Sequence, residues 1–62
     1  MPLPPKKVIK ARGLYDFNAG EAGELGFVVG DELVILTQNG EWWEAELRGR
    51  RGLIPSNYVQ LL

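Results

Sequence analysis

Carboxylate side chains dominate the middle of this 62-residue chain, and they could bind a cationic group. Between Gly13 and Leu47 there are eight acids and no Lys or Arg: Asp16, Glu21, Glu24, Asp31, Glu32, Glu41, Glu44 and Glu46. The bases lie on the two flanks: Lys6, Lys7, Lys10 and Arg12 before this stretch, Arg48, Arg50 and Arg51 after it. Because carboxylates repel phosphate, we expect a cationic partner and no nucleic acid. Most of the eight acids are expected to be ordinary solvated side chains.

Aromatic side chains are the second group that could bind a ligand. In the run WWEAEL, Trp42 shares its face with Glu44 and Glu46, so we expect it to point outward, where an exposed Trp marks a binding surface. Trp43 has the opposite parity and is expected to pack structurally. Three further aromatics fall outside the expected core: Tyr15, Phe17 and Tyr58. Such rings offer apolar area, and Trp and Tyr also donate hydrogen bonds.

Composition excludes most catalytic chemistry. The chain has no Cys and no His, which removes thiol nucleophiles, disulfides, zinc knuckles and the commonest general base. Paired-carboxylate catalysis stays formally open, but so short a chain hardly encloses a water-excluding cleft. We therefore expect no enzyme, no metal site and no cofactor. The absence of Cys fits a reducing compartment and apolar runs are short, so we expect a cytoplasmic protein without a membrane span.

Short alternating runs separated by Gly-containing turns predict strands and no helix of useful length. The predicted strands are 8–13, 31–37, 42–47, 52–54 and 58–61, with a long Gly-rich excursion at 18–26 and turns at 30–31, 38–40 and 48–50. Pro55 is expected to end regular pairing, and Ser56 to cap one short turn.

Five short strands favour an all-β fold, a small antiparallel barrel or an orthogonal pair of sheets, because closure hides strand edges. The expected inward positions are Ala11, Gly13, Leu25, Phe27, Leu33, Ile35, Ala45, Ile54 and Val59. Residues 1–7, MPLPPKK, hold three of the four prolines and no apolar periodicity. They are expected to form an extended polyproline II tail or linker outside the core, with the folded domain at 8–62.

Five motifs in this order resemble the SH3 domain family. GLYDF at 13–17 is similar to the family's ALYDY, and ELGF at 24–27 to its acidic-Leu-x-Phe segment. Gly30-Asp31 matches its diverging turn, Trp42-Trp43 its tandem tryptophans, and GLIPSNYV at 52–59 its final motif. The resemblance covers about 10–62 and leaves out the tail.

The resemblance implies a five-stranded SH3-type barrel with RT, n-Src and distal loops and a short 3-10 turn. It implies a non-catalytic adaptor or scaffold module in signalling, binding proline-rich PxxP peptides with flanking Arg or Lys in a shallow aromatic groove. The RT loop (about 18–26) and the n-Src loop (about 38–41) would flank that groove. The implied peptide-binding residues are Tyr15, Phe17, Glu21, Glu24, Glu41, Trp42, Pro55, Asn57 and Tyr58.

Each implied residue has a role. Tyr15 and Tyr58 would form one proline pocket, and the next would be lined by Phe17, Trp42, Pro55 and Tyr58. Asn57 would donate to a peptide carbonyl. Glu24 would pair with the ligand's Arg or Lys, with Glu21 and Glu41 as flanking acids.

Three residues depart from the family pattern. Phe17 replaces the usual Tyr and loses a hydroxyl, and Leu53 replaces a common aromatic at the edge of the specificity pocket. Gly13 replaces the usual Ala, and we expect it to cost backbone entropy and a methyl contact in the core.

Two alternatives and one further hypothesis remain open at the level of sequence. Tyr15, Phe17, Trp42 and Tyr58 could enclose a methylated lysine, as in an aromatic-cage reader on a similar barrel. A nucleic-acid-binding barrel would want a basic aromatic face, and this chain has acids there. The tail itself reads P-x-x-P-x-K through Pro2, Pro5 and Lys7, so it is a candidate self-ligand, binding in trans; a disordered linker is the simpler interpretation.

Overall fold

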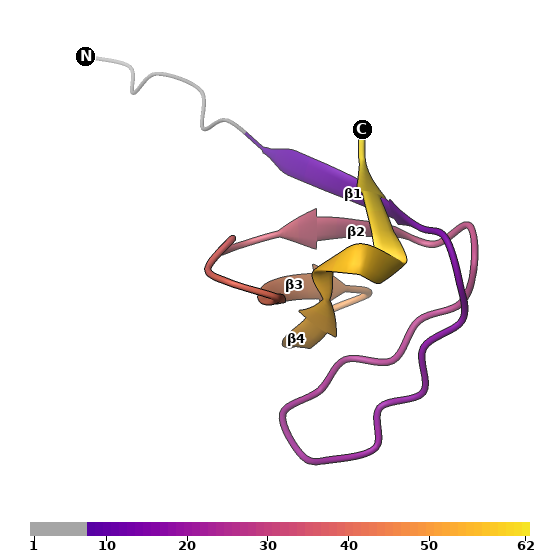
Figure 1. Cartoon of the computed structure of the whole chain (residues 1–62), viewed down its shortest axis with the longest axis vertical. Coiled ribbons are helices and arrows are strands. Elements are labelled where there is room, and N and C mark those ends of the chain that lie inside the picture. The colour runs from indigo at the N-terminus through magenta and orange to yellow at the C-terminus, as the bar shows by residue number, and fades with distance from the viewer. Residues whose placement is uncertain (1–7) are drawn as a thin grey trace.

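The alternating runs form the strands of a single sheet. The computed structural model describes residues 8–62, so the predicted tail at 1–7 lies outside the described residues. The elements in chain order are β1 (Ile9–Gly13), β2 (Glu32–Ile35), β3 (Trp42–Leu47), β4 (Arg50–Pro55), the 3-10 turn η1 (Ser56–Tyr58) and β5 (Val59–Leu61) (Figure 1). The long loop between β1 and β2 extends away from the strands. Within residues 8–62, no helix has the length and apolar character needed to cross a membrane.

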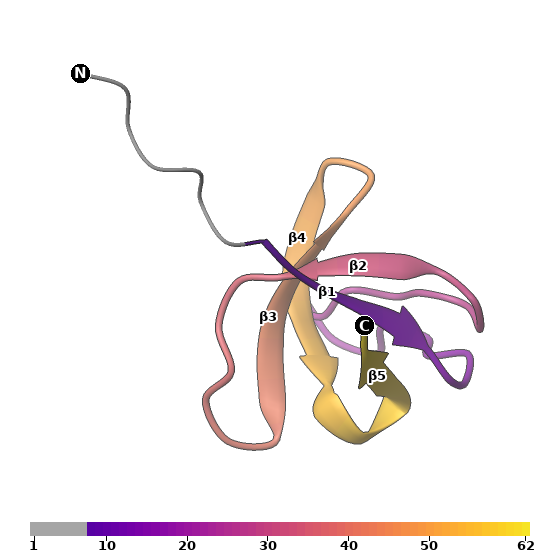
Figure 2. The same ribbon diagram turned by 90° about the horizontal axis from the view of Figure 1, so that it is seen from above.

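The five strands are ordered β4-β3-β2-β1-β5, and every neighbouring pair is antiparallel. The sheet bends strongly, so that β1 and β2 cross β3 and β4 at a steep angle (Figure 2). β4 and β5 are the two ends of this unclosed sheet and are connected through η1. The predicted all-β, five-stranded fold is confirmed.

The inner face of the bent sheet holds the core. Eight apolar side chains are buried there: Ala11, Leu25, Phe27, Leu33, Ile35, Ala45, Ile54 and Val59. Gly13 is buried as well, so all nine predicted inward positions lie inside. Trp43 packs against this core from a half-buried position, as its parity predicts.

A two-residue connection joins β3 to β4. Leu47 pairs with Arg50, and the two residues between them, Arg48 and Gly49, have φ of 52° and 79°. Two successive positive φ values suit a tight hairpin because they match the twist of the flanking strands. Gly49 adopts this conformation readily, whereas the backbone of Arg48 lies in the left-handed region, which residues with a Cβ disfavour.

Several element ends differ from the prediction. β4 spans Arg50–Pro55 and not 52–54, because only Arg48 and Gly49 form the turn and Arg50 already pairs with Leu47. β5 begins at Val59, since Tyr58 belongs to η1.

β2 ends at Ile35, two residues early, because the N–H groups of Leu36 and Thr37 both donate to Glu44 O, at 2.7 and 3.3 Å, so that two residues face one as in a bulge. Ser56 does not cap the short turn: Pro55 occupies the N-cap position and no side chain bonds there.

The expected loss of a methyl contact at Gly13 is also wrong. A Cβ at this position would lie 2.8 Å from the carbonyl oxygen of Val28 and 2.9 Å from the Phe27 ring. No space is left for a methyl group, so the glycine allows the loop after β1 to pack directly on the strand.

Candidate functional site

Four aromatic rings form a row on the outside of the sheet, which we call the aromatic row. The Tyr15 and Tyr58 rings lie edge to face with centroids 5.4 Å apart. The Phe17 ring follows, 5.9 Å from Tyr58 and 6.0 Å from Trp42. Tyr15 is 59% exposed and Trp42 43% exposed, so the row presents ring surface to solvent.

Backbone hydrogen bonds bring these rings together from distant segments. Leu14 N donates to Tyr58 O at 2.7 Å, which ties the start of the long loop to the end of η1. Phe17 and Phe27 exchange two backbone bonds of 2.8 and 3.0 Å. The Phe17 ring thereby lies against buried Phe27, and its other edge faces the row.

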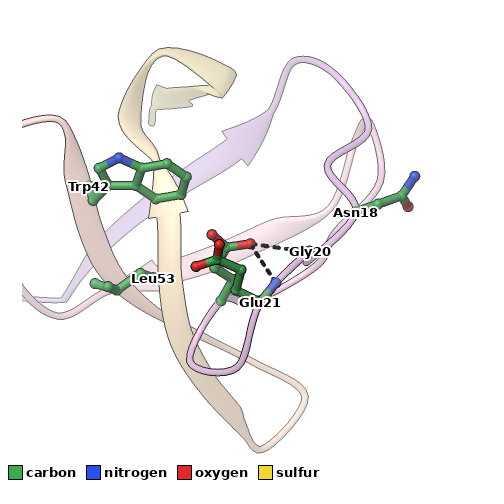
Figure 3. A pocket seen from close by; sticks show the side chains of 6 residues that line it. Asn18, Gly20, Glu21, Trp42 and Leu53 are labelled. Carbon is green, nitrogen blue, oxygen red and sulfur yellow. Dashed lines mark hydrogen bonds between the residues drawn. The ribbon is translucent and has the colours of Figure 1, made fainter.

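Trp42 lines two hollows. The first, which we call the acidic hollow, has a volume of about 640 Å³. It is lined by Asn18, Gly20, Glu21, Glu24, Trp42 and Leu53. Figure 3 shows the Glu21 side chain between the Trp42 indole and the backbone of the long loop. The hollow is therefore bounded by an aromatic face on one side and by carboxylates on the other.

One oxygen of Glu24 organises the long loop. Its Oε1 accepts hydrogen bonds from Gly20 N at 2.8 Å and from Glu21 N at 3.2 Å. These bonds close the tip of the loop and fix the half-buried carboxylate at the floor of the acidic hollow. The same carboxylate has a second oxygen with which to meet a cation.

The long loop is seated on the edge of β4. Leu25 N donates to Leu53 O at 2.9 Å, and Leu53 N donates to Gly23 O at 2.8 Å. Gly52 permits this approach because a Cβ there would lie 2.9 to 3.0 Å from backbone atoms of Gly23, Glu24 and Leu25. The loop thus covers an edge strand and holds the acidic hollow beside Trp42.

The second hollow shares only Trp42 with the first. It has a volume of about 450 Å³ and is lined by Glu41, Trp42, Pro55, Ser56 and Asn57. Ser56 N donates to Glu41 O at 2.9 Å, and Trp42 pairs with Pro55 in the β3–β4 ladder. These contacts join η1 to the loop before β3 and set Asn57, which is exposed, at the rim.

The predicted site residues fall into these three neighbouring features. Tyr15, Phe17 and Tyr58 belong to the aromatic row, and Trp42 belongs to the row and to both hollows. Glu21 and Glu24 line the acidic hollow, while Glu41, Pro55 and Asn57 line the second one. The three predicted acids therefore do not line one hollow, because Glu41 lines the second and the other two line the acidic hollow.

Sequence reasoning missed Asn18, Gly20 and Ser56 as lining residues. Most acids were expected to be solvated, and two of them, the exposed Asp16 and the half-buried Asp31, also hold the turn before β2. Asp16 Oδ1 accepts from Val29 N at 2.8 Å, and Asp31 Oδ2 accepts from Val28 N at 3.0 Å. The first bond joins residues thirteen positions apart, so no local pattern announces it.

The electrostatics of this surface favour a cation. The three carboxylates Glu21, Glu24 and Glu41 flank the Trp42 ring, and the ion pairs of the described residues involve other acids: Asp31, Glu32 and Glu46. Among residues 8–62 no cluster of His, Cys, Asp and Glu is arranged to hold a metal ion. The arrangement offers apolar ring faces, hydrogen-bond donors and negative charge to an elongated ligand.

Known proteins of one family resemble this chain. The family model described as SH3 domain matches residues 12–56. The myosin ID heavy chain of Dictyostelium discoideum is 57% identical over 53 residues, which cover 84% of this chain and 5% of that protein. The csh3 protein of Schizosaccharomyces pombe is 45% identical over 58 residues, covering 92% of this chain and 20% of that protein. The chain thus spans a small part of these curated relatives.

Solved structures agree with the sequence comparison. The C-terminal SH3 domain of myosin IB from Entamoeba histolytica, bound to an EhFP10(GEF) peptide, superposes with a TM-score of 0.90 at 40% identity, covering 94% of this chain and 98% of that one. An Acanthamoeba myosin I SH3 domain bound to Acan125 gives a TM-score of 0.81 at 42% identity, covering 87% and 95% of the two chains.

Proposed function

The chain belongs to the SH3 domain family of non-catalytic protein-interaction modules, and from this premise we propose that it binds proline-rich PxxP peptides with a flanking Arg or Lys. The peptide would lie along the aromatic row, and its basic residue would enter the acidic hollow. An adaptor or scaffold role follows, in which the domain recruits partners to the protein that carries it. We expect an affinity on the order of micromolar, about −8 kcal/mol.

One observation carries this proposal: the aromatic row ends at the acidic hollow, with Trp42 belonging to both. A ligand that crosses the row therefore brings its next residue beside carboxylates. The groove therefore selects ligands with two features in a fixed order: an apolar extended stretch, and a positive charge that follows it.

A polyproline II segment suits the row physically. It has three residues per turn and no internal hydrogen bonds, so its carbonyls are free and its extended form loses little entropy on docking. Prolines three residues apart lie on one side and can insert between Tyr15, Tyr58 and Phe17. The Trp42 indole N–H and the Asn57 amide are the donors for the exposed carbonyls.

The basic residue would give the ligand its direction. A Lys or Arg in the acidic hollow gains a charge-assisted hydrogen bond to Glu24 and a cation–π contact with Trp42. Glu21 adds to the same field, and Glu41 attracts cationic groups at the second hollow. Structural relatives that were solved bound to an EhFP10(GEF) peptide and to Acan125 support a peptide-binding role.

The test is a two-dimensional NMR titration of the full chain with a PxxPxK peptide. Shifts are expected at the Trp42 indole and at the amides of Tyr15, Glu24, Asn57 and Tyr58. A methyl-lysine peptide and an oligonucleotide serve as comparisons, and we expect neither to shift this set. No shift at millimolar PxxPxK peptide would refute the proposal, and saturable shifts with methyl-lysine alone would favour the aromatic-cage alternative.

A further inference from the structure

We propose that residues 1–7 of one molecule bind the groove of a second copy of this chain, so that the domain associates with itself through its own tail. This inference rests on the proposed function, since it names a ligand for the same groove. The groove here means the aromatic row together with the acidic hollow. The tail belongs to the printed sequence and joins the described domain at Val8.

The tail has the spacing that the groove requires. Pro2 and Pro5 are three residues apart, which is one turn of a polyproline II helix and places both rings on one side. Leu3 and Pro4 between them keep the segment apolar, and Lys7 follows two positions after Pro5. The two prolines would contact the aromatic row and Lys7 would follow them into the acidic hollow, so their order in the tail matches the order of these two features in the groove.

Charge favours this pairing over many other proline-rich segments. Lys6 and Lys7 bring two adjacent positive charges, and Glu21 and Glu24 line the hollow with two carboxylates. The chain as a whole carries a net charge of −1, so two copies have little overall repulsion to overcome. The opposite charges lie at the two surfaces that would meet.

The tail cannot fill the groove of its own domain. Lys7 lies two residues before Ile9, which pairs with Ile35 in the β1–β2 ladder. The acidic hollow lies beyond β4, where the long loop meets Leu53, and β2 and β3 separate β1 from β4. Measured along the surface of the sheet, which a chain on its outside must follow, the three strand spacings come to about 14 Å at about 4.8 Å each, whereas two extended residues span roughly 7 Å.

A second molecule removes this restriction. Val8 and Ile9 are 59% and 40% exposed, so the tail leaves the domain from an accessible surface. Tail and groove are different surfaces of one chain, so each molecule can give its tail and receive another. Such a heterologous contact forms either a reciprocal pair or an open row of domains. Outside partners then compete with the tails, and their apparent affinity falls as the domain concentration rises.

The experiment mixes two full-length variants. The receiver is ¹⁵N-labelled and carries P2A and P5A, which remove the tail's ring positions and leave its groove intact. The donor is unlabelled W42A, which keeps its tail. We expect donor addition to shift the Trp42 indole and the Glu24 and Tyr58 amides of the receiver, with half-saturation between about 0.1 and 1 mM. A donor that also carries P2A and P5A should leave them unchanged.

Three outcomes decide the matter. Equal shifts with both donors, or none with either, overturn self-recognition; if W42A does not fold, the wild-type chain replaces it as donor. An unrelated PxxPxK peptide titrated into the same receiver separates the two proposals. Shifts with that peptide but not with the donor reject self-recognition and leave the proposed function standing, whereas no response to either rejects both.

Discussion

Two adjacent tryptophans have different roles because they lie on opposite faces of β3. Trp42 is 43% exposed and joins the aromatic row, whereas the Trp43 ring packs against the core and its Nε1–H donates to Gly40 O at 3.1 Å. A buried aromatic contributes to stability, and an exposed one in a groove contributes to binding. The same substitution at the two positions therefore separates folding from recognition.

We predict that W42A weakens PxxPxK binding at least about 10-fold while changing the free energy of unfolding by less than about 1 kcal/mol. W43A is expected to cost about 3 kcal/mol, which is most of what so small a core supplies. Circular dichroism melts and peptide titrations of both variants measure these effects. Equal losses of stability in the two would contradict the division of roles.

Glu24 uses its two carboxylate oxygens for different purposes. Oε1 closes the loop through Gly20 N and Glu21 N, and the charge of the group serves the ligand. We predict that E24Q, which keeps an acceptor oxygen, retains the loop and lowers affinity for a PxxPxK peptide about 5-fold. The affinity for a PxxPxA peptide should stay nearly constant.

E32Q is the matched control for this charge. Glu32 pairs with Arg12 on the β1–β2 ladder, away from both hollows, at 3.6 Å in an exposed position. Its neutralisation changes net charge by the same amount and should leave both peptide affinities unaltered within about twofold. If E32Q lowered the affinity for the PxxPxK peptide as much as E24Q does, the change in net charge would explain the effect, and a specific contact in the acidic hollow would not.

At the scale of elements, the long loop between β1 and β2 depends on the absence of a side chain in β4. Gly52 lies beneath the backbone of Gly23, Glu24 and Leu25. We predict that G52A destabilises the domain by about 1–3 kcal/mol because three backbone atoms block the new methyl group. The variant should also weaken PxxPxK binding, since lifting the loop moves Glu24 away from Trp42. Urea unfolding and peptide titration measure the two effects.

Gly20 offers the control for this prediction. A Cβ there meets only Glu24 Oε1, at the ordinary distance of 3.9 Å, so G20A should change the free energy of unfolding by less than about 0.5 kcal/mol. The two substitutions add the same methyl group to the same loop–strand region. If G52A and G20A were destabilised equally, the loss of a glycine would explain the effect, and the packing of the loop backbone on Gly52 of β4 would not.

Elements with period-2 alternation could be predicted from the sequence, and elements defined by non-local contacts could not. β3 and the inward positions within the predicted strands follow from alternation, whereas Leu25 and Phe27 belong to the long loop between β1 and β2. The early end of β2 depends on a bulge facing Glu44, and the close fit at Gly13 depends on Val28. The aromatic site residues were recognised through motif resemblance and parity, whereas Asn18 and Gly20 line the hollow only because the loop folds back.

At the scale of the whole molecule, the bent sheet makes one surface from segments far apart in the chain. The groove takes residues from the long loop, from the start of β3, and from the end of β4 with η1. No single segment carries the whole of the aromatic row or the whole of the acidic hollow. Peptide binding therefore requires the whole folded sheet, because the binding residues come together only when all of these segments are in place.

The distribution of charge over the molecule predicts how salt affects recognition. Eight acids lie between the two basic flanks, and the carboxylates at the groove are exposed or half-buried, so dissolved ions can screen them. Raising NaCl from about 0.05 to about 0.5 M should weaken PxxPxK binding several-fold, mainly through a slower association rate. Stopped-flow fluorescence of Trp42 separates the two rate constants. A PxxPxA peptide, which docks through ring contacts alone, should change less than about twofold, and equal salt dependence of the two peptides would refute the cation-binding role of the acidic hollow.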